Sequence, residues 1–98
     1  MCAELKTPRG VYYLRLAAPA EAADADTILP LALERADGIE RVTFRCRIKG
    51  RSSDADMAEV LIERIAPVIR RDFETVREAA LKSIRAERKL LEIVLSLL

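Results

Sequence analysis

The chain has 98 residues, with 17 basic and 16 acidic side chains, a net charge of +1 and 51% apolar residues. A chain of this length and hydropathy forms one folded domain, so we exclude a disordered protein. The near-neutral charge lacks the basic excess typical of dedicated nucleic-acid or membrane-surface binders. The chain contains no histidine, which removes the commonest general base and the commonest metal ligand.

Other side chains are also missing. The chain has no asparagine and no glutamine, and its 13 arginines outnumber its 4 lysines. Loss of the thermolabile amides beside many charges is typical of thermophilic proteins. A GC-rich genome that favours alanine and arginine codons explains the same composition, and both explanations stay open.

The first quarter of the chain predicts one strand. Residues 1–10 are expected to form an irregular leader, because they end in turn-forming residues. Residues 11–17 (VYYLRLA) are rich in β-forming side chains and predict a strand. Residues 18–26 form a small acidic connection, in which Asp24 or Asp26 is expected to cap the next element.

Residues 27–37 (TILPLALERAD) predict a helix. Pro30 falls in the first turn, where a missing N–H costs little, and Gly38 stands where a helix end favours a left-handed residue. Apolar residues at helical spacing would share one face: Ile28, Leu29, Ala32, Leu33 and Ala36.

Residues 40–49 predict a strand with one dry and one wet face. The apolar set is Val42, Phe44, Cys46 and Ile48, and the polar set is Arg41, Thr43, Arg45, Arg47 and Lys49. Cys46 is therefore expected in the core, whereas Cys2 is expected to be an exposed thiol near the end of the chain. Two separated cysteines indicate neither a disulfide framework nor a metal site.

The remainder, residues 51–98, predicts a C-terminal helical segment. Apolar residues recur at helical spacing, and Pro67 favours a kink or break, so we expect helices over 54–66 and 67–97. Residues 89–98 (KLLEIVLSLL) also fit the period of a strand, and this alternative stays open.

The expected order is strand, helix, strand, helix within a single domain, 1–98. Residues 1–50 then form a strand–helix–strand unit with parallel strands, followed by a long C-terminal helix kinked near Pro67. This α+β arrangement resembles half of a ferredoxin-like layer, and the resemblance concerns the fold alone. Two strands are too few for independent stability, so the sheet would be completed by another copy or by the C-terminal tail.

The C-terminal apolar stripe predicts association. A helix over 67–97 would be about 46 Å long, against a diameter near 30 Å for a domain of this size. Its end would expose a large apolar patch, so we expect a homo-oligomer or a protein partner and no membrane insertion. The alternative is a helix that folds back at 82–89 and buries its own tail. The candidate interface residues are Phe73, Val76, Ile84, Leu91, Val94, Leu95 and Leu98.

The basic side of the second predicted strand supports an alternative function. Alternate residues of a strand lie about 6.6 to 6.8 Å apart, close to the phosphate spacing along a nucleic-acid strand. The candidate nucleic-acid or phosphate-binding residues are Tyr13, Arg15, Arg41, Arg45, Arg47, Lys49 and Arg51. The competing interpretation is the ordinary solvated face of a sheet, and the net charge of +1 favours it.

No sequence motif indicates catalysis. The three glycines stand apart, so no phosphate-binding loop exists, and a Ser–His or Cys–His pair cannot form without histidine. Paired aspartates such as Asp54 and Asp56 could bind a hard cation, but expected helix starts explain them. We therefore expect a non-enzymatic protein without cofactor or metal. Glu4 and Lys6 interrupt any apolar run near the start, which predicts no signal peptide and a cytoplasmic protein.

Overall fold

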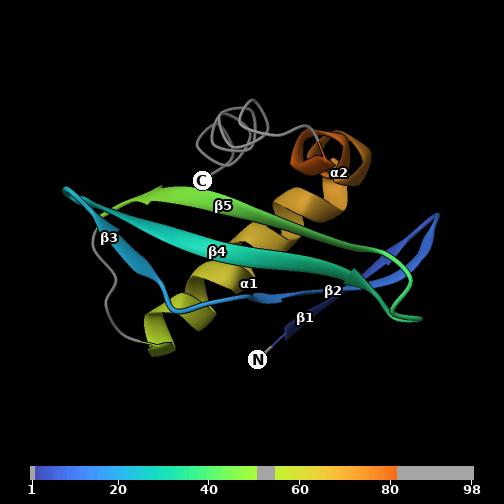
Figure 1. Ribbon diagram of the computed structural model, residues 1–98, viewed down its shortest axis with the longest axis horizontal. Coiled ribbons are helices and arrows are strands. Elements are labelled where there is room, and N and C mark those ends of the chain that lie inside the picture. The colour runs from blue at the N-terminus through green and yellow to red at the C-terminus, as the bar shows by residue number, and fades with distance from the viewer. Residues whose placement is uncertain (1, 51–54, 82–98) are drawn as a thin grey trace.

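The computed structural model describes residues 2–50 and 55–81 of the chain (Figure 1). Strands come first and helices follow, so the α+β class is confirmed and the strand–helix–strand–helix order is wrong. The elements are β1 (Cys2–Thr7), β2 (Gly10–Leu16), β3 (Glu21–Ala23), β4 (Asp26–Arg35), β5 (Arg41–Lys49), α1 (Ala55–Arg71) and α2 (Phe73–Leu81).

The sheet has five strands, and every pairing in it is antiparallel. The long strand β4 lies at the centre, with β5 along one side and both β2 and β3 along the other. Strand β1 pairs with the outer side of β2. The parallel crossover predicted for a half ferredoxin-like unit is therefore wrong, because short hairpin connections join the strands instead.

Strand β4 occupies the residues for which the sequence predicts a helix. Leu29, Leu31 and Leu33 lie on the same face of the strand and are fully buried. This period of two includes Leu31, which the helical interpretation omits. Burial of Ala32 on the opposite face makes the segment almost continuously apolar, and such a run is compatible with either helix or strand.

Pro30 fits β4 because its missing N–H faces a gap in the ladder. Its carbonyl accepts a hydrogen bond from the Ala17 N–H at 2.8 Å, so its nitrogen also points away from β5. On that side β2 pairs with residues 31–35 and β3 with residues 26–28, so Pro30 lies where one partner strand replaces the other. Proline is tolerated at such interruptions.

The leader predicted for residues 1–10 is instead a β-hairpin. Its turn is closed by the Thr7 hydroxyl, which donates to the Gly10 carbonyl at 2.8 Å and accepts from the Arg9 N–H at 3.2 Å. Gly38 does adopt a left-handed conformation, with φ of 75°, but it does so in the turn between β4 and β5. The prediction of a left-handed residue at position 38 is therefore correct, but the residue belongs to a turn between strands and not to the end of a helix.

The two helices are divided at Asp72 and not at Pro67. Helix α1 continues through Pro67, which lies on the exposed side, so that water can reach a carbonyl that the proline leaves without its helical donor. At Asp72 the backbone N–H is shared between the carbonyls of Val68 and Ile69, both at 3.2 Å. Beyond Leu81 the predicted helix over 67–97 lies outside the described residues.

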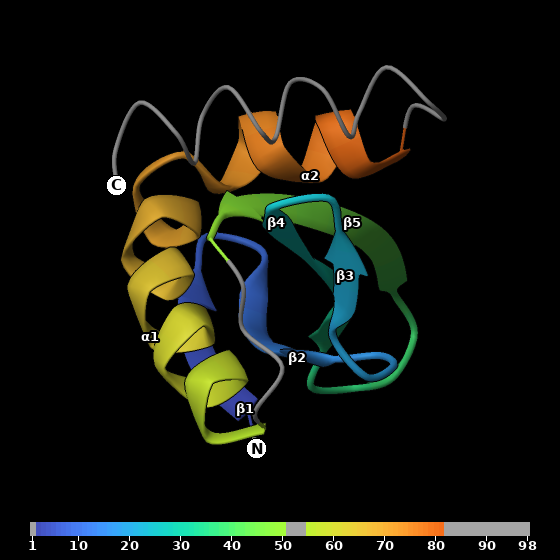
Figure 2. The same ribbon diagram turned by 90° about the vertical axis from the view of Figure 1, so that its left-hand side faces the viewer.

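One core lies between the inner face of the sheet and the two helices (Figure 2). Helix α1 packs against β1 and β2, whereas α2 packs against β5. The Tyr12 and Phe73 rings meet there in a tilted arrangement, with centroids 4.7 Å apart. The core residues are Leu5, Tyr12, Leu14, Leu29, Leu31, Leu33, Phe44, Cys46, Ile48, Leu61, Ile62, Ile65, Ala66, Ile69, Phe73, Val76 and Ala79.

Candidate interaction site

The basic residues of β5 lie on the outer face of the sheet, opposite the helices. The alternation predicted for this strand is confirmed, because Val42, Phe44, Cys46 and Ile48 are all buried. The Arg41, Arg45 and Arg47 side chains are 52%, 50% and 41% exposed. We call Arg41, Arg45, Arg47 and Lys49 the arginine row.

Each arginine of the row pairs with an acid on β4 or β3. The Arg41 Nε lies 2.9 Å from the Glu34 Oε1, and Arg45 forms an ion pair with Glu21. Register explains the first pair, because Glu34 of β4 stands directly opposite Arg41. The row is thus balanced by acids that lie on its β4 side.

Arg47 pairs with acids at the other end of β4. Its Nε donates to the Asp26 Oδ2 at 2.9 Å, and its Nη2 lies 3.9 Å from the Asp24 Oδ2. The hydrogen bond from Arg47 is the main reason that the pKa of Asp26 is lowered. The expectation that Asp24 or Asp26 caps a helix is wrong, since Asp24 lies in the turn between β3 and β4 and Asp26 is the first residue of β4.

The pairing register places Tyr13 and Arg15 on the same face as the arginine row. Tyr13 stands opposite Glu34, and the Arg15 Nη2 lies 2.7 Å from the Glu34 Oε1. Glu34 therefore joins Arg15 to Arg41 across three strands. The hydrogen bond from Arg15 is the largest cause of the lowered pKa of Glu34. Arg51, the last predicted member of this face, lies outside the described residues.

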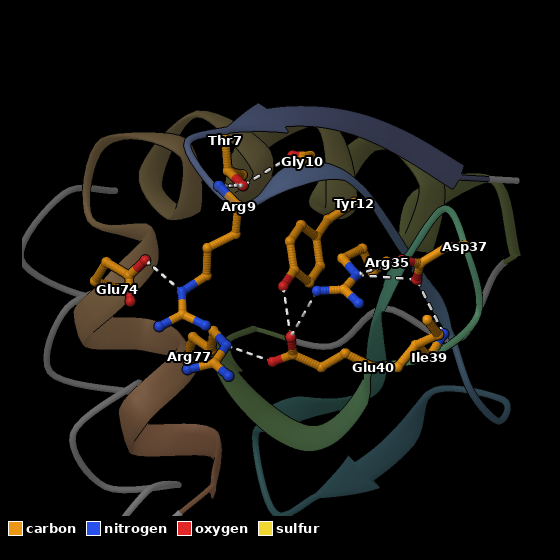
Figure 3. A network of polar contacts seen from close by, with 10 residues as sticks. All are labelled: Thr7, Arg9, Gly10, Tyr12, Arg35, Asp37, Ile39, Glu40, Glu74 and Arg77. Atoms are coloured by element: carbon orange, nitrogen blue, oxygen red, sulfur yellow. Dashed lines mark hydrogen bonds and ion pairs between the residues drawn. The ribbon is translucent and has the colours of Figure 1, made fainter.

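A second polar cluster fastens α2 to the sheet, and sequence reasoning did not name it (Figure 3). The buried Tyr12 hydroxyl donates to the Glu40 Oε2 at 2.7 Å, and the Arg77 Nε donates to the Glu40 Oε1. Arg35 approaches the same carboxylate, with its Nη1 at 3.9 Å from Oε2. The Glu40 and Arg77 side chains are only 18% and 16% exposed.

The protonation states of Tyr12 and Glu40 maintain the contact between α2 and the sheet. Burial, followed by the nearby Glu40 carboxylate, raises the pKa of Tyr12, so the phenol keeps its proton and remains a donor. The hydrogen bonds from Tyr12 and then Arg77 lower the pKa of Glu40, which remains an acceptor. At its margin the Arg9 Nε lies 3.0 Å from the Glu74 Oε1, a second and more exposed pair that reaches α2. The only sequence signal was Tyr12 at a buried position, where a hydroxyl usually finds a partner.

The structure describes two of the residues predicted for an oligomer interface. Phe73 and Val76 lie in the core of this chain, with exposures of 5% and 0%. The other five, Ile84, Leu91, Val94, Leu95 and Leu98, lie outside the described residues. Within the described ranges the large hydrophobic side chains that remain exposed are Ile39, Val60 and Leu81.

The cysteines and acids show no reactive or metal-binding arrangement in the part of the chain that the structure describes. Cys46 is buried, which raises the pKa of its thiol to about 12, and Cys2 is exposed and unpaired. Among residues 2–50 and 55–81, no three His, Cys, Asp or Glu residues are grouped so that they could hold a metal ion.

The described helices also give no membrane span, since neither is long and apolar enough to cross a bilayer. Comparison of the chain with protein-family models, curated proteins and solved structures found no match.

Proposed function

We propose that this protein is a small, non-enzymatic interaction or assembly subunit that associates through its apolar C-terminal residues. The proposal starts from residues 90–98, of which seven are leucine, isoleucine or valine. Fully burying side chains of this kind is worth about 1.5–3 kcal/mol each. These residues are therefore stabilised by packing against another apolar surface, away from water.

The observation that carries the proposal is that the described part of the chain has little apolar surface left to offer them. The inner face of the sheet is already covered by α1 and α2, and its leucines are fully buried. The outer face carries the arginine row with its acidic partners. A second copy, through its own C-terminal residues, supplies the missing surface, and we place this assembly in the cytoplasm.

The alternative, a nucleic-acid-binding module, stays a prediction that the charge geometry favours less. Arg41, Arg45 and Arg47 each have an acidic partner on the β4 side, and the phosphates of a strand laid across the outer face of the sheet would have to compete with these acids. A catalytic role has no comparable support. Both polar clusters join acids to arginines and lack a nucleophile set beside a base.

Light scattering coupled to size-exclusion chromatography tests the proposal on the full chain. We expect a dimer or larger species for the wild type, and a monomer when Leu91→Lys and Leu95→Lys place two charges in the apolar segment. The control is Glu92→Lys with Ser96→Lys, which adds lysines within the same segment without removing an apolar side chain and should keep the assembly.

A wild-type monomer at all accessible concentrations would overturn the proposal. Absorbance at 260 nm should be recorded in the same experiment, because the chain has two tyrosines and no tryptophan and so absorbs little itself. Excess absorbance at 260 nm that disappears at high salt would favour the nucleic-acid alternative instead.

A further inference from the structure

The edges of the sheet at β1 and at β5 differ in what covers them. Along β1, helix α1 packs against the strand, and the Arg70 Nη2 donates to the Glu4 carbonyl at 3.3 Å. Along β5, the described residues supply a strand partner only on the β4 side. Helix α2 contributes Phe73, Val76 and Ala79 to the core, so it packs on the inner face of β5 and not along its outer edge.

The backbone groups that face this outer edge follow from the ladder. The Arg35 N–H donates to the Glu40 carbonyl at 2.9 Å, which makes these two residues a hydrogen-bonded pair. Bonded and non-bonded pairs alternate in an antiparallel ladder, so the odd-numbered residues of β5 direct their N–H and C=O groups away from β4. Pro30 is consistent with this assignment. It lies opposite Arg45, and a non-bonded pair does not require the N–H that proline lacks.

The same odd-numbered residues carry the arginine row. Among the described residues its acidic partners lie on β3, on β4 or in the turn between them, which is one flank of the row. A guanidinium has five N–H donors, and the Arg41, Arg45 and Arg47 side chains are about half exposed. On the opposite flank, at the outer edge of β5, the outward backbone groups have no strand partner among the described residues, and the arginine side chains add positive charge there.

We propose that the outer edge of β5 binds an extended acidic segment of a partner protein by β-strand addition. The added strand would lie about 4.8 Å from β5 and satisfy the outward N–H and C=O groups of Thr43, Arg45 and Arg47. Carboxylates at its alternate positions would then face the outer flank of the arginine row. This inference rests on the proposed role as an interaction subunit and names the chemistry of one partner.

A second copy of this chain fits the same edge poorly. Antiparallel pairing of β5 with another β5 places two arginine rows side by side on one face. Like charges directly opposite one another destabilise a sheet. The row also discourages unspecific edge-to-edge aggregation, for which charged side chains are a known protection. Charge complementarity therefore selects an acidic strand.

The test uses fluorescence anisotropy with a labelled peptide of alternating threonine and glutamate and the full-length protein. We expect binding that weakens with salt, and none with the threonine–lysine peptide. Thr43→Pro removes an outward N–H and leaves the ladder to β4 intact, so it should weaken binding about tenfold. Thr43→Ala keeps the N–H and should bind as the wild type does.

Equal affinity for Thr43→Pro and Thr43→Ala, or no binding of the acidic peptide, would overturn the inference. Amide hydrogen exchange of the wild type gives an answer even if the proline variant does not fold. Thr43, Arg45 and Arg47 should exchange quickly when the protein is free and slowly with the acidic peptide. Slow exchange without peptide would show that the edge is already covered.

The variant with Leu91→Lys and Leu95→Lys separates the two proposals. It should lose self-association and keep peptide binding, because the contacts proposed for the peptide come from Thr43, Arg45 and Arg47 and both substitutions leave β5 unchanged. Failure of peptide binding in a chain that still assembles would remove this inference alone. A wild type that neither assembles nor binds the peptide would remove both.

Discussion

Glu40 is the residue at which three parts of the fold meet. Its carboxylate accepts from Tyr12 on β2 and from Arg77 on α2, and Arg35 on β4 approaches it. All three partners lose much of their contact with water, so the carboxylate replaces hydration that each would otherwise need. The residue therefore determines how α2 sits on the sheet.

Replacing Glu40 by glutamine should destabilise the protein by about 2 kcal/mol, since it leaves the largely buried Arg77 without a counter-charge. Tyr12→Phe removes one neutral donor and keeps the ion pair, so its cost should be about 1 kcal/mol. Urea unfolding monitored by circular dichroism measures both. Equal costs for the two variants would show that the charge of Glu40 contributes nothing beyond its hydrogen bond to tyrosine.

At the residue scale the sequence predicted the arginines of the arginine row and missed their acidic partners. Alternation identified the arginines of β5 and the buried thiol of Cys46 correctly. The acidic partners of these arginines could not be predicted, because Glu34 and Asp26 were placed on or before a helix, where they would not lie beside β5. Tyr12 and Glu40 are 28 positions apart, and only the antiparallel topology brings them together.

At the scale of the element, strand β4 was the decisive error. The apolar run from Thr27 to Leu33 follows no single period clearly, because the strand is central and is covered on both faces at Ala32. Helical spacing selected Ile28 for the core, whereas the strand buries Leu31. The predicted turn residues and the strands on either side were nevertheless close to their true positions.

This difference can be measured with two alanine substitutions. Leu31→Ala should cost about 3 kcal/mol, because it empties a fully buried position. Ile28→Ala should cost about 1 kcal/mol, because Ile28 is only partly buried on the outer face. The free energies of unfolding would be compared in urea. A larger cost for Ile28→Ala would contradict the strand register and support the helical interpretation.

The division between the helices shows a similar limit. Pro67 was the strongest breaking signal in the sequence, yet α1 accommodates it on its exposed side. The actual division at Asp72 contains neither glycine nor proline. It follows from packing, because the two helices cover different strands. Phe73 and Val76 of α2 are buried beside β5, whereas α1 packs against β1 and β2. Such a change of direction is a tertiary effect and leaves little trace in local sequence.

For the whole molecule, charge pairing predicts how stability depends on pH. The carboxyls of Asp26, Glu34, Asp37 and Glu40 all have lowered pKa values, chiefly through hydrogen bonds from arginines or, for Glu40, first from Tyr12. A lowered native pKa stabilises the fold above the unfolded pKa, near 4, and this contribution disappears as the pH falls further. Stability should therefore decline below about pH 4.5.

On the alkaline side Tyr12 has the opposite sign. Its native pKa is raised, and so is that of the buried Cys46 thiol, so the unfolded state releases both protons first. Stability should therefore begin to fall above about pH 8.5, where an exposed cysteine titrates, and fall further once the pH exceeds about 10. Thermal unfolding across pH should consequently show a plateau between these limits, with no histidine to produce a step near pH 6.5. Tyr12→Phe should lower the plateau and soften the alkaline decline beyond about pH 10, and it should also soften the acid decline, because the Tyr12 hydroxyl is the largest cause of the lowered pKa of Glu40. Glu40→Gln should soften the acid decline more, because it removes the titrating carboxyl itself. A decline of the same steepness in both variants and the wild type would mean that the buried cluster is not linked to the folding equilibrium.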